Sequence, residues 1–562
     1  MTAARRAPAP VPAPAPVPAP APVPASAPAP VLVVGGGPVG LTAANLLVAR
    51  GVPVVLVERN ASTSDEAKAI SLDDESLRAL QPDGLAQRVL DIVVPGTGTR
   101  YYDRRGRPLF HARGPRPYRL GHPFKNQFAQ PELEKILLDE LTSHPLADVR
   151  FATELRTVRE RADGGGVTAG LAATGGDEDT ELLDASWLLA CDGARSSVRE
   201  LCGIGMTGTS HQQVWLVADL TGDRHDERYG MHRGTPDRPT VIVPGRGGRC
   251  RYEFLLRPGE GEKGTTPGFE TLRRLVAPYR TLDEDQVERC TAYTFNAVVA
   301  DRWRRGHVLL LGDAAHMMPP FAGQGLNSGI RDAANLVWKV EQVWRGTAAA
   351  SLLDTYEAER RPHATAVVHY SERLGEVVMT TSRTRALVRD LTVRALLRVP
   401  AGRDYLTEMR FRPVARHRAG LVVGDHPLTG TQLPQPLVLV PPGLRPCPLD
   451  DALGESYALL GVDVTEAAWA RFDTGDWPGS ALDIRRVDVL LGDRLPSAGG
   501  RRAAVADADR GLEEALGAAR NRFVLVKPDR YIAAVMGPDD IPAVAAVLRR
   551  GLRTAAGEDP PD

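Results

Sequence analysis

Cysteine is scarce in this sequence, and its spacing excludes the usual cysteine-based sites. The 562 residues include five cysteines, and no two of them form a CxxC pair. An odd, dispersed set in a long chain is typical of a reduced, cytoplasmic protein without zinc ligation or a disulfide framework. We therefore expect a cytoplasmic location and no bound metal. The five positions are Cys191, Cys202, Cys250, Cys290 and Cys447.

Long apolar runs and an excess of charge are also missing. No stretch approaches the roughly 18 uninterrupted apolar residues that a membrane-spanning helix needs. The 69 basic residues balance 70 acidic ones, which leaves a formal net charge of −1. This balance provides no electrostatic reason to expect a nucleic acid or an anionic membrane as a partner.

Residues 1–30 consist almost wholly of alanine, proline and valine. Arg5 and Arg6 resemble the start of a signal peptide, but proline at nearly every second position prevents the helical apolar segment of such peptides. We expect an extended, disordered tail outside the fold.

The stretch VLVVGGGPVG (31–40) joins a short apolar strand, Val31–Val34, to a glycine-rich turn. Gly35, Gly37 and Gly40 match G-x-G-x-x-G, and LTAANLLVARG predicts a helix that ends at Gly51. In this pattern the first glycine permits the tight turn, the second lets the backbone approach a pyrophosphate, and the third lets the helix pack closely on the strand. The helix N-terminus offers free N–H groups and a positive dipole end to the phosphates.

A second strand, VPVVLVE, ends in Glu58. An acidic residue at this point accepts hydrogen bonds from the ribose of a bound adenosine. Strand, helix, second strand and terminal acid together indicate a dinucleotide-binding unit, but they do not distinguish NAD from FAD.

Two later stretches each run from an apolar strand into an aspartate and a glycine. SWLLACDGARSSVRE (186–200) contains Asp192-Gly193, and HVLLLGDAAHMMPPFAGQGLNSGIRDAANLVWKVEQVW (307–344) contains Gly312-Asp313, followed by a loop and a long helix. The spacing of apolar residues in that helix predicts one apolar face. These residues are Ile330, Ala334, Val337 and Val340.

The three motifs, in this order and at about these separations, resemble those of the class A flavoprotein aromatic hydroxylases, typified by para-hydroxybenzoate hydroxylase. MMPPFAGQGLNSGIRDAANLVWK and KAISLDDESLRALQ are most similar to the 3-(3-hydroxyphenyl)propionate hydroxylase branch. The resemblance covers roughly residues 31–400. It implies an α/β fold (α+β overall), in which a Rossmann-like FAD-binding domain is interleaved with a β-sheet substrate domain and followed by long helices.

The resemblance also implies a division of the chain. We expect the FAD-binding domain over 31–400, with substrate segments at about 100–130 and 205–300, a linker over 401–420, and a thioredoxin-like C-terminal domain over 421–555. Cys447 is the only cysteine of this last part, so a thioredoxin-type redox role is excluded and a structural or subunit-interface role, as in a homodimer, is expected.

The same resemblance assigns roles around a non-covalent FAD. Asp313 would bind a ribityl hydroxyl, Gln130 would touch the cofactor, and Lys68 falls where many relatives place a pyrophosphate-binding cation. N–H groups at the start of the helix after the loop would stabilise negative charge on the reduced flavin. The implied cofactor-binding residues are Gly35, Gly37, Pro38, Val39, Gly40, Glu58, Arg59, Lys68, Gln130, Asp192, Asp313, Pro320, Gly323, Gly325, Leu326 and Asn327.

Three groups of polar residues have simpler interpretations. Asp192 is also placed to cap the turn before ARSSVRE. His316 is more often a packed histidine than a catalytic one. Asp73, Asp74 and Glu75 lie at a predicted helix start, where carboxylates favour the dipole, so capping is the better interpretation there.

The region between the two aspartate motifs predicts strands. QVWLVADL is one, and RPTVIV and RCRYEFLL form a hairpin. Tyr252 and Phe254 alternate with Glu253 along the strand. This pattern favours core packing at least as much as substrate contact for the two aromatic residues. The segment ERCTAYTFNAVVADRW brings Tyr293, Phe295 and Asn296 toward the Gly-Asp motif.

Only one complete dinucleotide fingerprint is present, and in this the chain resembles enzymes in which the nicotinamide docks transiently near the flavin. The expected activity is an FAD-dependent monooxygenase that uses NAD(P)H and O₂ to hydroxylate an aromatic substrate, phenolic or polyketide-derived, through a flavin C4a-hydroperoxide. The alternatives are Baeyer–Villiger or epoxidising oxygenation of a polyketide, and a non-catalytic flavin-binding redox partner. No catalytic base can be named from the sequence.

Overall fold

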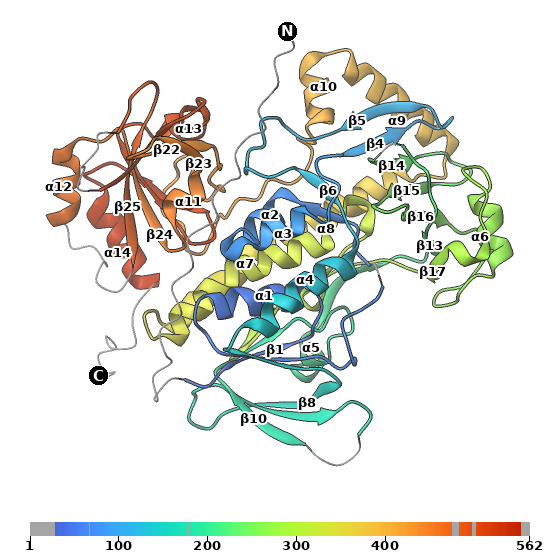
Figure 1. Cartoon of the computed structure of the whole chain (residues 1–562), viewed down its shortest axis with the longest axis horizontal. Coiled ribbons are helices and arrows are strands. Elements are labelled where there is room, and N and C mark those ends of the chain that lie inside the picture. The colour runs from blue at the N-terminus through green and yellow to red at the C-terminus, as the bar shows by residue number, and fades with distance from the viewer. Residues whose placement is uncertain are drawn as a thin grey trace, which may run out of the picture.

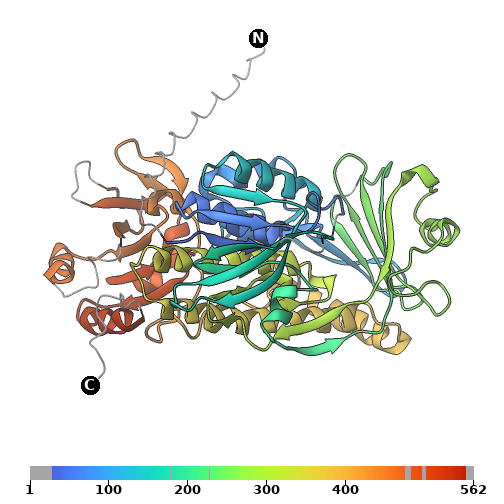
Figure 2. The same cartoon turned by 90° about the horizontal axis from the view of Figure 1, so that it is seen from below.

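The computed structural model describes residues 28–66, 68–176, 180–226, 228–474, 483–496 and 502–551. Figures 1 and 2 show three parts in a row: a C-terminal sheet on the left, a central part rich in helices, and a second large sheet on the right. Residues 1–27 of the expected tail lie outside the described residues. The last tail residues contact the fold, because Trp344 Nε1 donates to Ala29 O and Ser186 N donates to Pro30 O, each over 3.0 Å.

The central sheet has the strand order β19-β20-β11-β1-β2-β7, and its inner strands run parallel. The strands are Val31–Val34 (β1), Val54–Val57 (β2), Ala147–Arg150 (β7), Trp187–Ala190 (β11), Arg304–Arg305 (β19) and Val308–Leu310 (β20). The predicted first strand is therefore confirmed. Continuous apolar runs suit β1, β2 and β11 because both faces of this sheet are covered.

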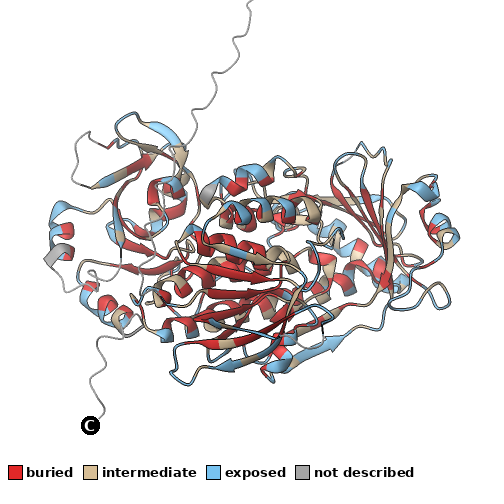
Figure 3. Ribbon diagram, turned by 60° about the horizontal axis from the view of Figure 1, so that its bottom comes forward, coloured by how far each residue is buried: buried red, intermediate tan, exposed pale blue. Residues whose placement is uncertain are grey.

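One face of the central sheet meets helices and the other meets a small antiparallel sheet. Figure 3 shows that the strands and helices of this region are largely buried. The helices are Pro38–Ala49 (α1), Gln130–Ser143 (α4) and Gly325–Trp344 (α7), and α1 packs against both others. The small sheet has the order β10-β9-β8, with Thr153–Glu160 (β8), Val167–Ala173 (β9) and Glu181–Ala185 (β10).

Helix α7 differs from the prediction of a single apolar face. Ile330, Val337 and Val340 are buried as expected, but Asp332 and Lys339 on other faces are equally inaccessible. The helix crosses the interior, so its polar side chains need buried partners. Lys339 Nζ finds one in Glu359 Oε2, over 2.8 Å.

The second large sheet has seven strands in the order β17-β13-β16-β15-β14-β4-β5. They are Thr99–Tyr102 (β4), Pro108–Ala112 (β5), Trp215–Leu220 (β13), Gly230–Arg233 (β14), Thr240–Pro244 (β15), Cys250–Leu255 (β16) and Val287–Tyr293 (β17). The predicted hairpin is β15–β16. Tyr252 and Phe254 are fully buried in the core on the outer face, beneath helix α6 (Phe269–Val276), as the core-packing interpretation expected.

Shorter elements connect these sheets around the site. They are Ser71–Asp73 (β3), Asp74–Ala79 (α2), Leu85–Leu90 (α3), Lys125–Gln127 (β6), Ser197–Leu201 (α5), Met206–Ser210 (β12), Asn296–Ala300 (β18) and His316–Met317 (β21). β18 pairs with both β12 and β21, and β21 follows the Gly-Asp motif, so the segment that contains Asn296 lies toward that motif as predicted, with Asn296 near Met317.

Long helices then lead to the C-terminal part: Asp354–Val378 (α8), Arg383–Leu397 (α9) and Pro400–Thr407 (α10). Helix α10 occupies the beginning of the segment expected to be a linker. Among the described helices, none combines the length and the apolar character needed to cross a membrane.

The C-terminal sheet has the order β23-β22-β26-β25-β24-β27-β28. Its strands are Leu437–Val440 (β22), Arg445–Pro448 (β23), Tyr457–Val462 (β24), Ile484–Leu490 (β25), Ala503–Asp507 (β26), Arg522–Val526 (β27) and Ile532–Met536 (β28). Helices Leu449–Leu453 (α11), Glu466–Thr474 (α12), Gly511–Leu516 (α13) and Ile541–Gly551 (α14) accompany them. Three parallel strands followed by two antiparallel ones are a thioredoxin-like arrangement, as expected.

A buried ionic cluster joins this C-terminal part to the central helices. Glu359 Oε2 on α8 accepts from Lys339 Nζ and from Lys527 Nζ, over 2.8 and 2.9 Å. His417 Nδ1 lies 3.1 Å from Lys527 Nζ. The ammonium groups of Lys339 and Lys527 neutralise the Glu359 carboxylate, so the cluster stabilises the contact between the central helices and the C-terminal part.

Candidate active site

The glycine turn has the close contacts that its motif requires. Gly35 has φ +109°, and a methyl group there would lie 2.4 Å from the carbonyl oxygen of Cys191. A methyl group on Gly40 would lie 2.0 Å from the carbonyl oxygen of Gly35. Gly37, in contrast, has nothing within 4 Å of that position. The close packing of the turn thus requires glycine at positions 35 and 40. The space beside Gly37 is instead part of the cavity.

Glu58 holds the end of β2 against this turn. Its Oε2 accepts from Gly36 N over 2.7 Å, and its Oε1 accepts from Asn60 N over 2.9 Å. A carboxylate can accept about four hydrogen bonds, so Glu58 keeps capacity for a ligand hydroxyl. Its side chain lines the cavity next to Arg59.

One cavity of about 1090 Å³ connects the glycine turn, the Gly-Asp motif and the inner face of the seven-stranded sheet. This volume exceeds the roughly 300–1,000 Å³ of most single-ligand pockets. Of the sixteen residues expected to bind the cofactor, Gly40 and Asn327 are absent from its lining and the others contribute to it. The tertiary structure therefore brings together segments that are almost 300 residues apart in the chain.

Asp313 projects into this cavity from the end of β20. Its side chain is open to the cavity. Desolvation by the surrounding protein raises the pKa of Asp313, whereas the nearby His316 and Lys68 lower it by a smaller amount. Among the described residues, no group hydrogen-bonds to the Asp313 carboxylate. It is thus free to accept from a bound hydroxyl.

Two helix N-termini face the cavity without side-chain caps. Gly37 precedes α1 and Gln324 precedes α7, and neither provides a capping hydrogen bond. Gly325 and Leu326, in the first turn of α7, line the cavity. The first N–H groups of a helix lack partners within it, so both ends can bind negative charge.

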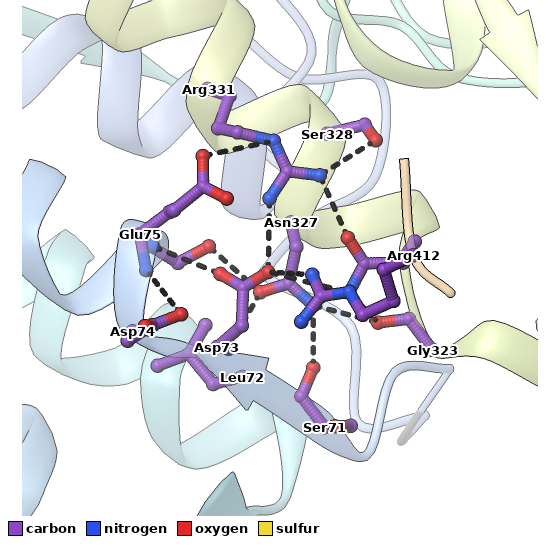
Figure 4. Close-up of polar contacts among 12 residues, drawn as sticks. Ser71, Leu72, Asp73, Asp74, Glu75, Gly323, Asn327, Ser328, Arg331 and Arg412 are labelled. Atoms are coloured by element: carbon purple, nitrogen blue, oxygen red, sulfur yellow. Dashed lines mark hydrogen bonds and ion pairs between the residues drawn. The ribbon is translucent and has the colours of Figure 1, made fainter. Parts of the chain in front are cut away.

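Asn327, unlike Gly325 and Leu326 before it, does not line the cavity. Its amide is fully buried: Oδ1 accepts from Asp73 N over 2.9 Å, and Nδ2 donates to Gly323 O over 2.7 Å and to Ser71 O over 3.0 Å. The side chain therefore fastens the loop to β3 (Figure 4).

Asp73 caps helix α2, as the helix-start interpretation predicted, by accepting from Ser76 N over 3.0 Å. It has a second role that the sequence did not indicate. Its Oδ2 accepts from Arg331 Nη1 over 2.9 Å and faces Arg412 over 3.4 Å (Figure 4). Burial alone would raise the pKa of Asp73, but the two guanidinium groups outweigh it and lower the pKa.

Asp192 caps a turn and also lines the cavity. Its Oδ2 accepts from Val198 N over 3.1 Å, which caps the turn before α5. Its Oδ1 is buried without a hydrogen-bond partner, and the residue lines the cavity. Because a buried acceptor without a partner is costly, Oδ1 is placed for a ligand group.

Gln130 and Lys68 lie on one side of the cavity near Glu58. Gln130 Oε1 accepts from Ala69 N and its Nε2 donates to Glu134 Oε1, each over 2.7 Å, so Gln130 holds the segment that carries Lys68. His316 does not line the cavity. It is fully buried with Nε2 2.8 Å from Asp332 Oδ2, which confirms its interpretation as a packed histidine.

The seven-stranded sheet and the small β3–β6 sheet add polar side chains that the sequence did not single out. Lys125 and Gln127 of β6 and His232 of β14 line the cavity, and both amide atoms of Gln127 and Nδ1 of His232 are buried without partners. Lys125 Nζ donates to Thr99 Oγ1 over 2.8 Å. Burial lowers the pKa of Lys125 to about 8. Short strands with no motif carry these residues, so no local signal could have identified them.

These features fit FAD. The open space at Gly37 and the uncapped N-terminus of α1 suit a pyrophosphate, Glu58 suits a ribose, and the carboxylates of Asp192 and Asp313 suit hydroxyl groups. The uncapped N-terminus of α7 suits the electron-rich end of a reduced flavin.

Comparisons with known proteins agree with this geometry. A family model described as the FAD binding domain matches residues 28–371, and one described as the HcaD C-terminal domain matches residues 430–551. The chain is 38% identical over 543 residues to a 3-(3-hydroxy-phenyl)propionate/3-hydroxycinnamic acid hydroxylase of Mycolicibacterium smegmatis, with 92% of each chain covered. It is 39% identical over 441 residues to the enzyme of the same name from Mycobacterium avium, with 76% of each covered.

Solved structures show the same fold. The flavin-dependent monooxygenase PieE, solved with FAD and substrate, superposes with a TM-score of 0.77 at 22% identity, over 94% of this chain and 99% of that one. Aklavinone-11 hydroxylase, solved with FAD and aklavinone, superposes with a TM-score of 0.74 at 25% identity, over 93% and 99%. With its FAD-binding motifs, its cavity and these relatives, the chain belongs to the FAD-dependent aromatic hydroxylases and resembles their 3-(3-hydroxyphenyl)propionate hydroxylase branch.

Proposed function

We propose that this protein oxidises NAD(P)H and inserts one atom of O₂ into the ring of a phenolic substrate that carries an anionic group. The observation that supports this most is the single cavity of about 1090 Å³, which has room beside the dinucleotide motifs for a second ligand against the seven-stranded sheet. When bound, FAD supplies the redox chemistry, taking electrons from NAD(P)H and transferring oxygen activated at its C4a position.

The protein binds and orients the cofactor in this proposal. Glu58 accepts from the adenosine ribose, the N-terminus of α1 with Pro38 and Val39 binds the pyrophosphate, and Asp313 accepts from the ribityl chain. Arg59 and Lys68 contribute positive charge, Gln130 and Asp192 contact the cofactor, and the loop from Pro320 through Gly323 to Leu326 lies along its ring. For Gly40 and Asn327 we now propose indirect roles, in the packing of the turn and of the loop.

The anionic group of the substrate is assigned to Lys125, Gln127 and His232. A methyl group on Gly230 would lie 3.7 Å from Thr99 Oγ1 and 3.8 Å from Gln127 Nε2, and Lys125 Nζ donates to the same Thr99 Oγ1, so Lys125 and Gln127 converge on one place. Lys125 supplies a charge there at neutral pH, because its pKa of about 8 keeps it mostly protonated. The names of the relatives, hydroxylases of a hydroxyphenylpropionate and a hydroxycinnamic acid, support a carboxylate as this group.

Oxygenation of a polyketide is the second candidate. The size of the cavity and the fold shared with aklavinone-11 hydroxylase favour it. Such a substrate needs no anion at Lys125, so Lys125→Met separates the two candidates. The variant should bind 3-(3-hydroxyphenyl)propionate at least tenfold more weakly if the carboxylate contacts Lys125.

The test is NAD(P)H oxidation by the purified holoenzyme with and without phenolic acids, with product analysed under ¹⁸O₂. The expected result is slow oxidation alone, faster oxidation with a hydroxyphenylpropionate or hydroxycinnamate, and one ¹⁸O atom in the product. Product labelled from water, or no stimulation by any phenol of a broad panel, would overturn the proposal.

A further inference from the structure

Glu253 lies on β16, in the interior of the seven-stranded sheet. Alternate side chains of a strand point to opposite faces, and its neighbours Tyr252 and Phe254 fill the outer core. Glu253 therefore points to the inner face, where it lines the cavity at 5% exposure. An acidic side chain at such a position is rarely this buried unless it has a partner.

The carboxylate of Glu253 has no such partner. Among the described residues it makes no hydrogen bond and no ion pair. The nearest guanidinium, that of Arg251, is committed elsewhere: Nε and Nη2 donate to Asp219 over 2.7 and 2.9 Å, and Nη1 donates to Lys68 O over 2.8 Å. A buried carboxylate left unpaired is costly, and such groups gather where they do chemistry.

The charged and titratable groups around Glu253 come from the neighbouring strands. Arg251 is on the same strand, Asp219 on β13, Arg289 and Tyr293 on β17, and His232 on β14. β15 contributes valines to this face. Burial raises the pKa of Glu253 to about 7. The positive charge of Arg251 lowers this pKa and the negative charge of Asp219 raises it, and both effects are smaller than that of burial.

Position along the strand places Glu253 over the middle of the cavity. Leu255, two residues later, packs into the aromatic cluster that contains Phe321, which belongs to the loop from Pro320 to Gln324 before α7. In that cluster the ring centres of Trp215 and Phe321 are 5.2 Å apart. Arg251, two residues earlier, contacts the segment of Lys68. Each step is about 7 Å along a strand. Glu253 is thus between the loop that faces the flavin ring and the phosphate side of the site.

The residues beside Glu253 form an apolar platform. Val217 on β13 and Val241 on β15 are its direct cross-strand partners, and both line the cavity. An aromatic ring lying on these valines would present a hydroxyl group to the carboxylate between them. His232, the cross-strand partner of Val241, leads on to Lys125 and Gln127, which are assigned to the anionic group.

We propose that Glu253 is the base that deprotonates the phenol of the substrate before oxygen transfer, an inference that rests on the proposed function. The phenolic O–H bond breaks, the proton bonds to a carboxylate oxygen of Glu253, and the electron pair remains on the phenolate oxygen. The phenolate is the more electron-rich ring and the better acceptor of an oxygen atom. A base that titrates near neutral pH is well matched to this step.

The first measurement uses the holoenzyme without turnover. 4-Nitrophenol, whose anion absorbs visible light, is bound to wild-type, Glu253→Gln and Glu253→Asp holoenzymes at a series of pH values from 6 to 9, and difference spectra give the ionised fraction of bound probe at each pH. In the wild type and Glu253→Asp we expect this fraction to follow a two-step titration, because the probe and the carboxylate share a proton, and in Glu253→Gln we expect a single step. Equal ionisation in wild type and Glu253→Gln would overturn the inference, whether or not any substrate is turned over.

The second measurement is the pH profile of kcat/KM. The wild-type value should rise with pH through about 7, as Glu253 loses its proton, and Glu253→Gln should lose this rising limb together with a factor of about 100 to 10,000 in rate. Lys125 titrates near pH 8, but its deprotonation as pH rises should weaken anion binding and so lower the value. Glu253→Asp should retain the rising limb at a lower rate, which a purely structural role would not produce.

Glu270→Gln is the matched control, because Glu270 lies exposed on α6 of the same sheet domain and pairs only with Arg273 among the described residues. It should match the wild type in every measurement. If no phenol is hydroxylated but the two-step titration of the bound probe requires Glu253, the proposed function fails and the inference about the base stands. If hydroxylation proceeds with an unchanged pH profile in Glu253→Gln, the inference fails and the function stands.

Discussion

The guanidinium of Arg331 donates to the carboxylate of Asp73 over 2.9 Å, and both side chains are buried. This pair joins α7 to the residue that caps α2, and the two partners are 258 residues apart in the sequence. Arg331 Nη2 also donates to Gln324 Oε1 over 2.8 Å, so the same guanidinium holds the loop residue that precedes α7.

Arg331→Met should therefore affect both stability and cofactor binding. The variant leaves Asp73 with only the longer ion pair to Arg412 among the described residues, and breaking a buried ion pair costs up to about 3–5 kcal/mol of unfolding free energy. FAD affinity should fall as well, because Gln324 loses its anchor. Urea denaturation and flavin fluorescence titration measure the two effects. Arg383→Met, which breaks an exposed pair with Asp237, should cost no more than about 1 kcal/mol; equal losses in both variants would contradict the prediction.

Two neighbouring glycines should separate folding from cofactor binding. Gly40→Ala forces a methyl group against the carbonyl oxygen of Gly35 and should destabilise the apoprotein. Gly37→Ala has open space at the methyl position and a backbone φ of −77°, so the apoprotein should be as stable as the wild type while FAD binding weakens. Thermal unfolding of apoprotein and FAD titration check this, and full FAD affinity in Gly37→Ala would refute the pyrophosphate assignment.

Glu58→Ala should lower FAD affinity about tenfold to a hundredfold, because a charge-assisted hydrogen bond contributes roughly 1.5–3 kcal/mol. Glu58→Gln keeps an acceptor for Gly36 N and loses the charge, so its affinity should lie between those of the alanine variant and the wild type. Equilibrium dialysis with FAD gives the dissociation constants. Identical constants for all three proteins would remove Glu58 from the ribose site.

Asp74 should make stability depend on pH. Burial, followed by the nearby carboxylates of Asp73 and Glu75, raises the pKa of Asp74 from 3.8 to about 8. The folded state then binds a proton that the unfolded state has lost, so this stabilising contribution is full below pH 3.8 and is lost progressively as pH rises to about 8. Asp74→Asn should flatten that dependence and be more stable than the wild type above pH 8.

Urea denaturation at a series of pH values measures this difference. Asp139→Asn, on the exposed side of α4, is the control and should follow the wild-type dependence. Parallel curves for wild type and Asp74→Asn would show that Asp74 is ionised in the folded protein at neutral pH.

Local sequence patterns predicted the parts of this protein whose contacts are close in the chain. The strand Val31–Val34, the turn at Gly35 and the helix after it follow from apolar runs and from glycine positions that no side chain could replace. The expectation for Asp313 came instead from the family resemblance, and the structure places the residue at the end of β20, where it lines the cavity.

The tertiary structure alone decided which other residues face the cavity. Glu253 and Tyr252 are adjacent on one strand, and only the packing of the sheet determines which of the two points to solvent, core or ligand. Lys125, Gln127 and His232 lie on short strands without a motif. Asp332 and Lys339 on α7 lie beside an apolar helix face, yet they are buried because α8 supplies Arg360 and Glu359 as their partners. Periodicity reports one element at a time, whereas a buried polar group depends on partners that only the folded chain brings within hydrogen-bonding distance.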